Sequence, residues 1–249
     1  TLLNQEVVIH SREAVRGIIS LLAKEKGVSS SKSILLEELV IDTGYSAEKV
    51  AELIQPGDII SIVRRPLTLL NQKIAGKALD DRAGIAVMAV CINELTRINH
   101  RHRVVAVATV QEEVGLRGAV TGTERLKPEI AVAIDVTHAQ TPDSKAQVNN
   151  QLGKGPVLAL GPNINPQIYQ GLKTAAEENH IPYQIEAVAG PTGTDARVIQ
   201  LVGEGIPTGL LSIPLRYMHT SVETVSLGDI VDSGKLLAHY IASLPEDLE

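Results

Sequence analysis

The pattern of apolar and polar positions along the chain changes near residue 76. Before that point, short apolar runs are separated by polar turns, and one stretch of helical periodicity begins at Ser46, a good N-cap residue. After it, apolar runs alternate with longer helical patterns, which is typical of a sheet covered by helices. The pattern therefore predicts a β-rich domain over residues 1–75 and an α/β domain over residues 76–249.

The elements expected in the first domain are strands at 5–10, 16–20, 38–42 and 59–63 and a helix at 46–54. Those expected in the second are strands at 104–108, 130–134, 157–160, 183–189 and 208–213, with helices at 83–99, 119–125, 165–179, 196–201 and 227–244. In the helix at 83–99, a stripe of Ile85, Met88, Ile92 and Leu95 is predicted to face the core. Ser226 and Asp229 have the spacing of a capping box.

The most informative stretch is the apolar run at 104–108, which is followed by two adjacent carboxylates. Its β-branched residues do not alternate with polar ones, which predicts a strand buried on both faces, as in a parallel sheet. Glu112 and Glu113 then fall near its C-terminal end, where α/β sheets place their ligands. Neighbouring side chains on an extended backbone point in opposite directions, so the two carboxylates suit different tasks. One would bind a metal and the other a water molecule; the alternative is a solvated turn.

Composition and charge narrow the classes of partner. The 249 residues carry a net charge of −6, which argues against nucleic acid or an anionic membrane surface as partner. The single cysteine, Cys91, excludes an intrachain disulfide and suits a reducing compartment. No apolar run reaches the roughly 20 residues that a membrane-spanning helix needs. We expect a cytoplasmic protein that acts on a small molecule or a peptide.

Four potential metal ligands fall where predicted elements meet loops: Asp80, Glu113, Asp135 and His219. Carboxylate and imidazole ligands without a thiolate suit zinc, cobalt or manganese in a site with open positions. Three carboxylates are too many for one divalent ion, but they suit two ions about 3.5 to 4 Å apart that share a bridging carboxylate. The positions of these four residues in the sequence are therefore compatible with a dinuclear hydrolase.

Five motifs in this order resemble the TET-type (tetrahedral-assembly) di-metal aminopeptidases, some of which carry the names glutamyl aminopeptidase, endoglucanase or cellulase. The motifs are GKALDDR at 76–82, QEEVGLRGA at 111–119, AIDV at 133–136, GTDA at 193–196 and IPLRYMHT at 213–220. IDTG at 41–44 and QPGD at 55–58 resemble the family's inserted PDZ-like oligomerisation domain. The resemblance implies a three-layer α/β/α catalytic domain, peptide substrates, and self-association into dimers and a tetrahedral dodecamer.

The resemblance also implies a role for each residue of the site. Asp80 corresponds to a carboxylate that bridges two divalent ions, zinc or cobalt, and Glu113 and His219 correspond to ligands of one of them. Asp135 corresponds to a ligand of the other ion, and Glu112 to the general base that takes a proton from the water activated by the two metals.

Two further residues, Asp195 and Arg216, are expected to support these residues or to contact the substrate. Neither the preferred N-terminal residue of the substrate nor the native metal follows from the sequence.

The sequence departs from the family pattern at one ligand. The family has a histidine in a His-x-Asp motif ahead of the inserted domain, and here no histidine is followed two positions later by aspartate. We therefore expect a further segment ahead of Thr1 that supplies this histidine. The alternative is a non-catalytic binding or assembly subunit whose metal site is damaged.

The chemistry argues against a glycosidase. Such an enzyme needs two carboxyl groups about 5 to 10 Å apart on either side of a sugar. Glu112 and Glu113 point apart, and the chain has no tryptophan or phenylalanine on which a sugar ring would stack.

Overall fold

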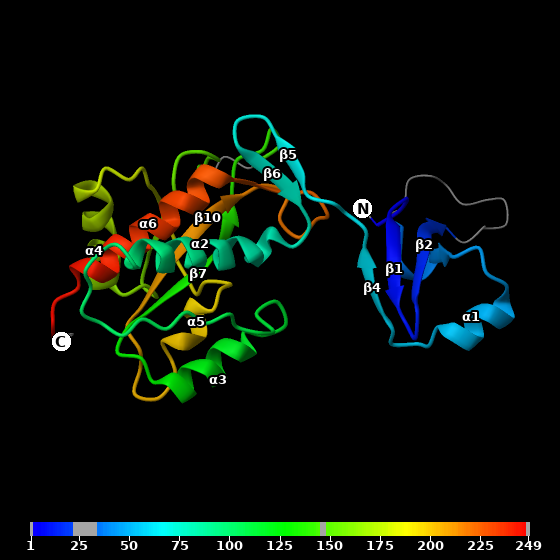
Figure 1. The fold of residues 1–249 in the computed structure, drawn as a ribbon, viewed down its shortest axis with the longest axis horizontal. Coiled ribbons are helices and arrows are strands. Elements are labelled where there is room, and N and C mark those ends of the chain that lie inside the picture. Colours follow the sequence, from blue (N-terminus) through cyan, green and yellow to red (C-terminus); the bar gives the residue numbers. More distant parts are fainter. Residues whose placement is uncertain (1, 22–33, 145–147, 248–249) are drawn as a thin grey trace. The chain divides into compact units, whose positions relative to one another are not determined.

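The computed structural model describes residues 2–21, 34–144 and 148–247, and it divides into two compact units (Figure 1). The units are Thr1–Arg65 and Pro66–Glu249, and this division lies ten residues before the domain boundary expected at residue 75. Residues 67–76 belong to the second unit because they form two strands that pair with each other, and the second of these also pairs with a strand near the C-terminus. Among the helices that the structure describes, none has the length and apolar character needed to cross a membrane.

The described residues of the first unit form an antiparallel sheet and one α-helix. Strands β1 (Glu6–His10), β2 (Ala14–Leu21), β3 (Leu39–Asp42) and β4 (Ile59–Ile62) have the order β3-β2-β1-β4, and a 3-10 turn, η1 (Leu36–Glu38), precedes β3. Burial alternates along β2, as expected for a sheet with one face on the core. Helix α1 (Ala47–Leu53) begins where Ser46 accepts a hydrogen bond from the Lys49 backbone N–H, which confirms the predicted cap.

The second unit is built on a mixed sheet. Its strands are β7 (Ala131–His138), β8 (Val157–Leu160), β9 (Gln184–Ala187) and β10 (Thr208–Leu215), in the order β7-β10-β8-β9. β10 is parallel to β7 and β8 is parallel to β9, but β10 and β8 run antiparallel, so the expectation of a parallel sheet is only partly met.

Helices pack against both faces of this sheet. They are α2 (Leu79–Leu95), α3 (Arg117–Leu126), α4 (Pro166–Glu178), α5 (Ala196–Ile199) and α6 (Leu227–Ser243). Leu211 of β10 belongs to a core cluster with α2, α4 and α6, whereas its neighbour Leu210 belongs to a cluster with α3 and α5. Successive side chains of a strand point to opposite faces, so the two groups of helices lie on opposite sides of the strands (Figure 1).

A second, three-stranded sheet joins distant parts of the chain and was not predicted. It consists of β5 (Leu67–Leu69), β6 (Lys73–Gly76) and β11 (Glu223–Ser226), in the order β11-β6-β5. In its register, Glu223 lies opposite Gly76, just ahead of α2. This sheet therefore brings the start of α2 beside the segment that precedes α6.

The prediction of a buried strand at 104–108 was wrong. The run forms no strand in the structure, and its side chains are partly exposed, Val104 by 37% and Val105 by 48%. It lines a cavity of about 910 Å³ together with residues of α2, α3, β7 and α6. The apolar composition of the run indicates burial, but a strand also needs hydrogen bonds to a neighbour, and β7 is an edge strand across this cavity.

Two predictions about helix faces and ends also need correction. Ile85 and Ile92 of α2 are about half exposed and line the cavity, whereas Leu95 enters the core as predicted, together with Val87 and Cys91. At α6, Ser226 makes no cap hydrogen bond. The Asp229 carboxylate accepts hydrogen bonds from the backbone N–H groups of Gly153 and Gly155 (2.7 and 2.8 Å) instead of joining a capping box. Long-range packing overrides the local pattern in both places.

Candidate functional site

The first part of the site is the turn into α2. Ala78 has a left-handed backbone (φ 52°), and Asp80 and Asp81 have non-helical angles although they lie at the helix start. Asp81 Oδ1 accepts a hydrogen bond from the Gly84 N–H (2.9 Å), so this carboxylate caps the regular part of the helix. Asp80 does not cap the helix, and only 8% of its side chain is exposed.

Three potential ligands converge on this turn. His219 Nε2 lies 3.2 Å from Asp80 Oδ2 and 3.4 Å from Glu113 Oε2. One ligand atom from each of these three residues lies within 4.8 Å of the other two, and we call them the donor triad. The His219 and Glu113 side chains are 65% and 55% exposed, so the site opens to solvent on their side. Two carboxylates and one imidazole form an open donor set that fits zinc or a similar divalent ion.

Glu112 and Glu113 are held by a compact turn ahead of α3. The Glu112 carbonyl accepts from the N–H groups of Gly115 (3.1 Å) and Leu116 (3.0 Å), and Gly115 has a φ of 118° that favours glycine. Burial raises the pKa of Glu112 to about 7, with Asp195 and Glu113 as the next causes. A carboxyl group with this pKa can accept and return a proton near neutral pH.

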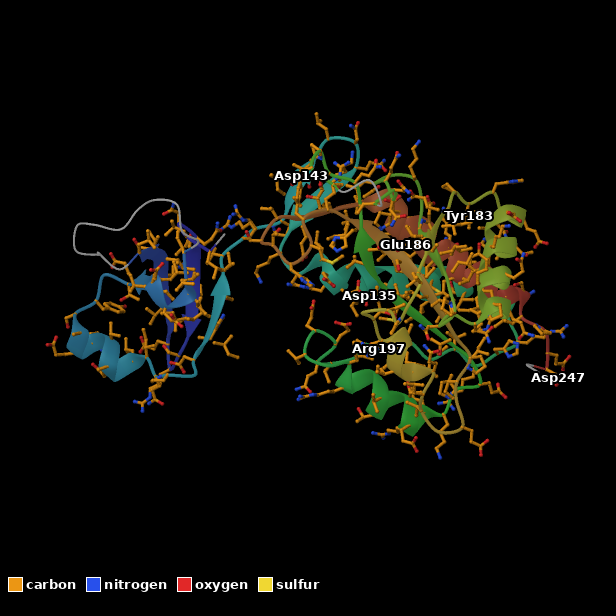
Figure 2. The ribbon with its side chains drawn as sticks, turned by 180° about the vertical axis from the view of Figure 1, so that it is seen from behind. Asp135, Asp143, Tyr183, Glu186, Arg197 and Asp247 are labelled. Carbon is orange, nitrogen blue, oxygen red and sulfur yellow. The ribbon has the colours of Figure 1, made fainter. Side chains whose placement is uncertain are left out.

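Asp135 lies within β7 rather than at its end, because the strand continues to His138. It is 9% exposed, and its Oδ1 accepts a hydrogen bond from the Val136 N–H (2.7 Å). Its position in the second unit is marked in Figure 2. Burial raises its pKa to about 7, and the charges of Glu112 and Asp80 add to the shift. The charges of five carboxyl groups act on one another, and we call these residues the acidic cluster: Asp80, Asp81, Glu112, Glu113 and Asp135. Asp135 is thus a member of the acidic cluster but not of the donor triad.

The cluster carries negative charge that its own side chains compensate only weakly. Burial raises the pKa of Asp80 to about 6, with Glu113 and Glu223 contributing, and raises that of Asp81 to about 8, with Asp135 contributing. In the described part of the chain, the ion pairs of Asp80 and Glu113 are both with His219. Crowded carboxylates with raised pKa values are what a divalent cation would stabilise in the ionised form.

The two supporting candidates have different surroundings. The Thr109 hydroxyl donates to Asp195 Oδ2 (2.6 Å), while Asp195 Oδ1 is buried and has no hydrogen-bond partner among the described residues. A buried acceptor of this kind is costly unless a ligand satisfies it, which favours a role for Asp195 in the working site. Arg216 Nε donates a hydrogen bond to the Gln140 carbonyl (2.6 Å). This bond holds the Arg216 guanidinium against the backbone of the segment that contains Gln140.

One residue of this site, Glu223, was not predicted from the sequence. It lies in β11, four positions after His219, and is 2% exposed. Its carboxylate accepts hydrogen bonds from the backbone N–H groups of Leu79 and His219. The only local signal was an acidic residue within a short β-branched stretch, and that signal does not distinguish a buried glutamate from one on the surface.

Comparison with known proteins finds aminopeptidases related to this chain. The family model of M42 glutamyl aminopeptidases matches residues 1–236. The chain is 35% identical to the lysyl aminopeptidase of Pyrococcus furiosus, covering 98% of this chain and 72% of the relative. It is 36% identical to a putative aminopeptidase of Acetivibrio thermocellus, covering 90% of this chain and 68% of the relative.

Solved structures of similar fold include an aminopeptidase from the archaeon Desulfurococcus kamchatkensis. That structure superposes with a TM-score of 0.89 and 39% identity, covering 98% of this chain and 70% of the other. A TET aminopeptidase from a marine-sediment Thaumarchaeota archaeon superposes with a TM-score of 0.88 and 31% identity, covering 98% and 72%.

Proposed function

Because the chain belongs to the M42 glutamyl aminopeptidase family, whose members are metal-dependent hydrolases, we propose that the donor triad binds a divalent metal ion at its active site. The observation that carries this proposal is the convergence of Asp80, Glu113 and His219 on one point from three separate segments. The substrate would be the N-terminal residue of a peptide, since the chain is an aminopeptidase by family.

We propose two ions per chain, zinc or cobalt, with Asp80 bridging them and Asp135 as a ligand of the second. The support is electrostatic. The charge of Asp135 raises the pKa of Asp81, and the charge of Asp80 raises the pKa of Asp135. One divalent ion would leave part of the negative charge of these carboxylates uncompensated. When bound, the ions would acidify a water molecule and polarise the scissile carbonyl group.

Glu112 is proposed as the general base and acid. It would take a proton from the attacking water and then donate a proton to the amine that leaves. Its pKa of about 7 lets it exist in either form at neutral pH, and its neighbour Glu113 is left to bind metal. Asp195 would support Glu112 through the negative charge it places nearby, and Arg216 would contact the substrate or support His219 from the start of the same loop.

We propose that the first unit is a PDZ-like oligomerisation domain inserted in a three-layer catalytic domain, with the functional boundary near residues 75 and 76. The TET1 peptidase of Pyrococcus horikoshii, 29% identical with a TM-score of 0.79, can assemble into a tetrahedron or a large octahedral shell. Relatives of this chain therefore self-associate, and a dimer that builds a tetrahedral dodecamer is the assembly we propose here.

Glu112→Gln tests the general-base role. The amide keeps the size of the side chain but cannot accept the proton, so turnover of short peptides should fall by about a hundred- to ten-thousandfold. Metal content, measured by elemental mass spectrometry, should stay at about two ions per chain. Glu124→Gln is the matched control, because Glu124 is an exposed residue of α3 that pairs with Lys127. Unchanged turnover in Glu112→Gln would refute the assignment.

The same measurements address the alternative of a non-catalytic assembly subunit, which the comparisons do not support. If the unaltered chain bound one ion or none and cleaved no peptide, that alternative would replace the proposal. Two ions per chain together with peptide cleavage would exclude it.

A further inference from the structure

We propose that Glu223 is a positioning residue that fixes the distance between Asp80 and His219 by binding the backbone of both loops. This inference rests on the proposed metal site, since it concerns two members of the donor triad. Glu223 itself makes no contact with the reacting atoms in this scheme. Its function would be to hold the two loops in the arrangement that a metal ion requires.

The hydrogen bonds of Glu223 join segments that are far apart in the sequence. Its Oε2 accepts from the backbone N–H groups of Leu79 (2.7 Å) and Asp80 (3.1 Å), and its Oε1 accepts from that of His219 (2.9 Å). The two oxygens of one buried carboxylate thus reach both loops. A carboxylate is a stronger acceptor than a neutral group, so each of these bonds constrains the backbone position of its donor.

Both loops need an external constraint because of their backbone conformations. Ala78, two residues ahead of Asp80, has a φ of 52°, and Tyr217 and His219 both have a φ of 60°. Residues with a Cβ atom rarely adopt these left-handed angles, so the conformations persist only where surrounding contacts hold them. The Glu223 hydrogen bonds act at or beside these positions.

Glu223 is itself well anchored. In the sheet register it lies opposite Gly76, four residues ahead of Asp80. The next residue, Thr224, exchanges two backbone hydrogen bonds with Arg216 (2.9 and 3.0 Å), three residues ahead of His219. The backbone is therefore fixed by strand pairing at the base of each loop, and the Glu223 side chain fixes the tips.

The direction of the Glu223 oxygens argues against a role as a metal ligand. Three N–H groups already occupy most of the acceptor positions of its carboxylate, and the residue is 2% exposed. Outer groups that orient metal ligands typically change metal affinity by about ten- to a hundredfold when they are removed. An effect of that size separates positioning from a general contribution to folding.

The test compares Glu223→Gln with Asp229→Asn. In Glu223→Gln, one of the two oxygens becomes an NH₂ group, which must face a backbone N–H whichever way the amide turns. Asp229 is a matched control because it is also a buried carboxylate (1% exposed) that accepts two backbone N–H bonds, but from Gly153 and Gly155. Both variants should lower the melting temperature of the metal-free protein.

Zinc affinity, measured by competition with a chelator, should distinguish the two variants. We expect Glu223→Gln to weaken zinc binding by about ten- to a hundredfold and Asp229→Asn to leave it unchanged. Equal zinc affinity in the parent and in Glu223→Gln would overturn the proposal, as would equal losses in the two variants. If Glu223→Gln does not fold, Glu223→Asp replaces it, because the shorter side chain keeps the charge but cannot reach both loops.

The control with the unaltered chain separates this proposal from the proposed function. If the parent protein binds no divalent ion, the metal site itself is refuted and the role of Glu223 with it. If the parent binds zinc and both Glu223→Gln and Glu223→Asp bind it equally well, only the positioning role is refuted.

Discussion

Without metal, the acidic cluster should make the protein less stable as the pH rises from about 6 to about 8, and a divalent cation should remove that loss. The structure raises the pKa of Asp80 to about 6, of Glu112 and Asp135 to about 7, and of Asp81 to about 8. Burial is the largest cause in each case, and neighbouring carboxylates add to it. Ionising these groups in the folded chain therefore costs free energy.

The sign follows from comparing the folded and unfolded chains. In the unfolded chain these carboxyls have pKa values near 4 and have lost their protons by about pH 6. The folded chain still holds protons between pH 6 and pH 8, so its stability is greatest at the lower pH and falls as the pH rises through the folded pKa values. This is the reverse of the usual behaviour of carboxylates in ion pairs.

The magnitude can be worked from the same values. At pH 7, Asp81 would be mostly protonated and Glu112 and Asp135 about half protonated, which gives roughly two protons more than in the unfolded chain. Each such proton corresponds to about 1.4 kcal/mol per pH unit, and solvent screening at the partly exposed Glu112 reduces its share. We expect the free energy of unfolding to fall by about 2 kcal/mol per pH unit near pH 7.

Urea unfolding at pH 6, 7 and 8 in the presence of a chelator measures this slope. The helical circular dichroism signal follows the second unit, which contains α2, α4 and α6. Asp81→Asn should reduce the slope by roughly half, because Asp81 holds about one of the two protons. Added zinc should stabilise the protein more at pH 8 than at pH 6. A stability that is constant or rises from pH 6 to pH 8 would refute the reasoning.

Two further predictions concern packing. In Gly118→Ala, the new Cβ would overlap the backbone N and O atoms of Val110, so the turn that carries Glu112 should shift and the melting temperature should fall. Gly122 lies in the same helix, and a Cβ added there would have its nearest neighbour, Val107 Cγ1, at 3.9 Å, so Gly122→Ala should raise stability by up to about 1 kcal/mol. Leu236→Ala removes a fully buried side chain and should cost about 2 to 5 kcal/mol in urea unfolding, whereas Leu227→Ala, 39% exposed, should cost less than about 1 kcal/mol; similar losses for the two leucines would contradict the assigned core.

Sequence patterns were reliable where the determining interactions are local. Strand β8 has the predicted bounds, and α4 begins after Asn165, whose side chain accepts from the N–H groups of Gln167 and Ile168. The motif that contains Glu113 and the one that contains His219 also selected residues that the structure brings together. Cap and turn preferences depend on a few neighbouring residues, so the sequence can be read directly at such positions.

The failures share a different cause. The apolar run at 104–108 has the composition of a strand but pairs with none of the strands that the structure describes. Asp229 accepts hydrogen bonds from a loop 76 residues away rather than capping its own helix. Glu223 could not be recognised because its importance depends on backbone groups of Leu79 and Asp80, some 140 residues earlier.

The sequence alone thus determined the class of fold, the family resemblance and the candidate ligands of the site. Only the tertiary structure decided which strand edges pair, which face of α2 is buried, and that Glu223 joins the loops of Asp80 and His219. The physical reason is that local backbone preferences are set by adjacent residues, whereas the choice of partner between distant segments depends on the packing and hydrogen bonding of the whole chain.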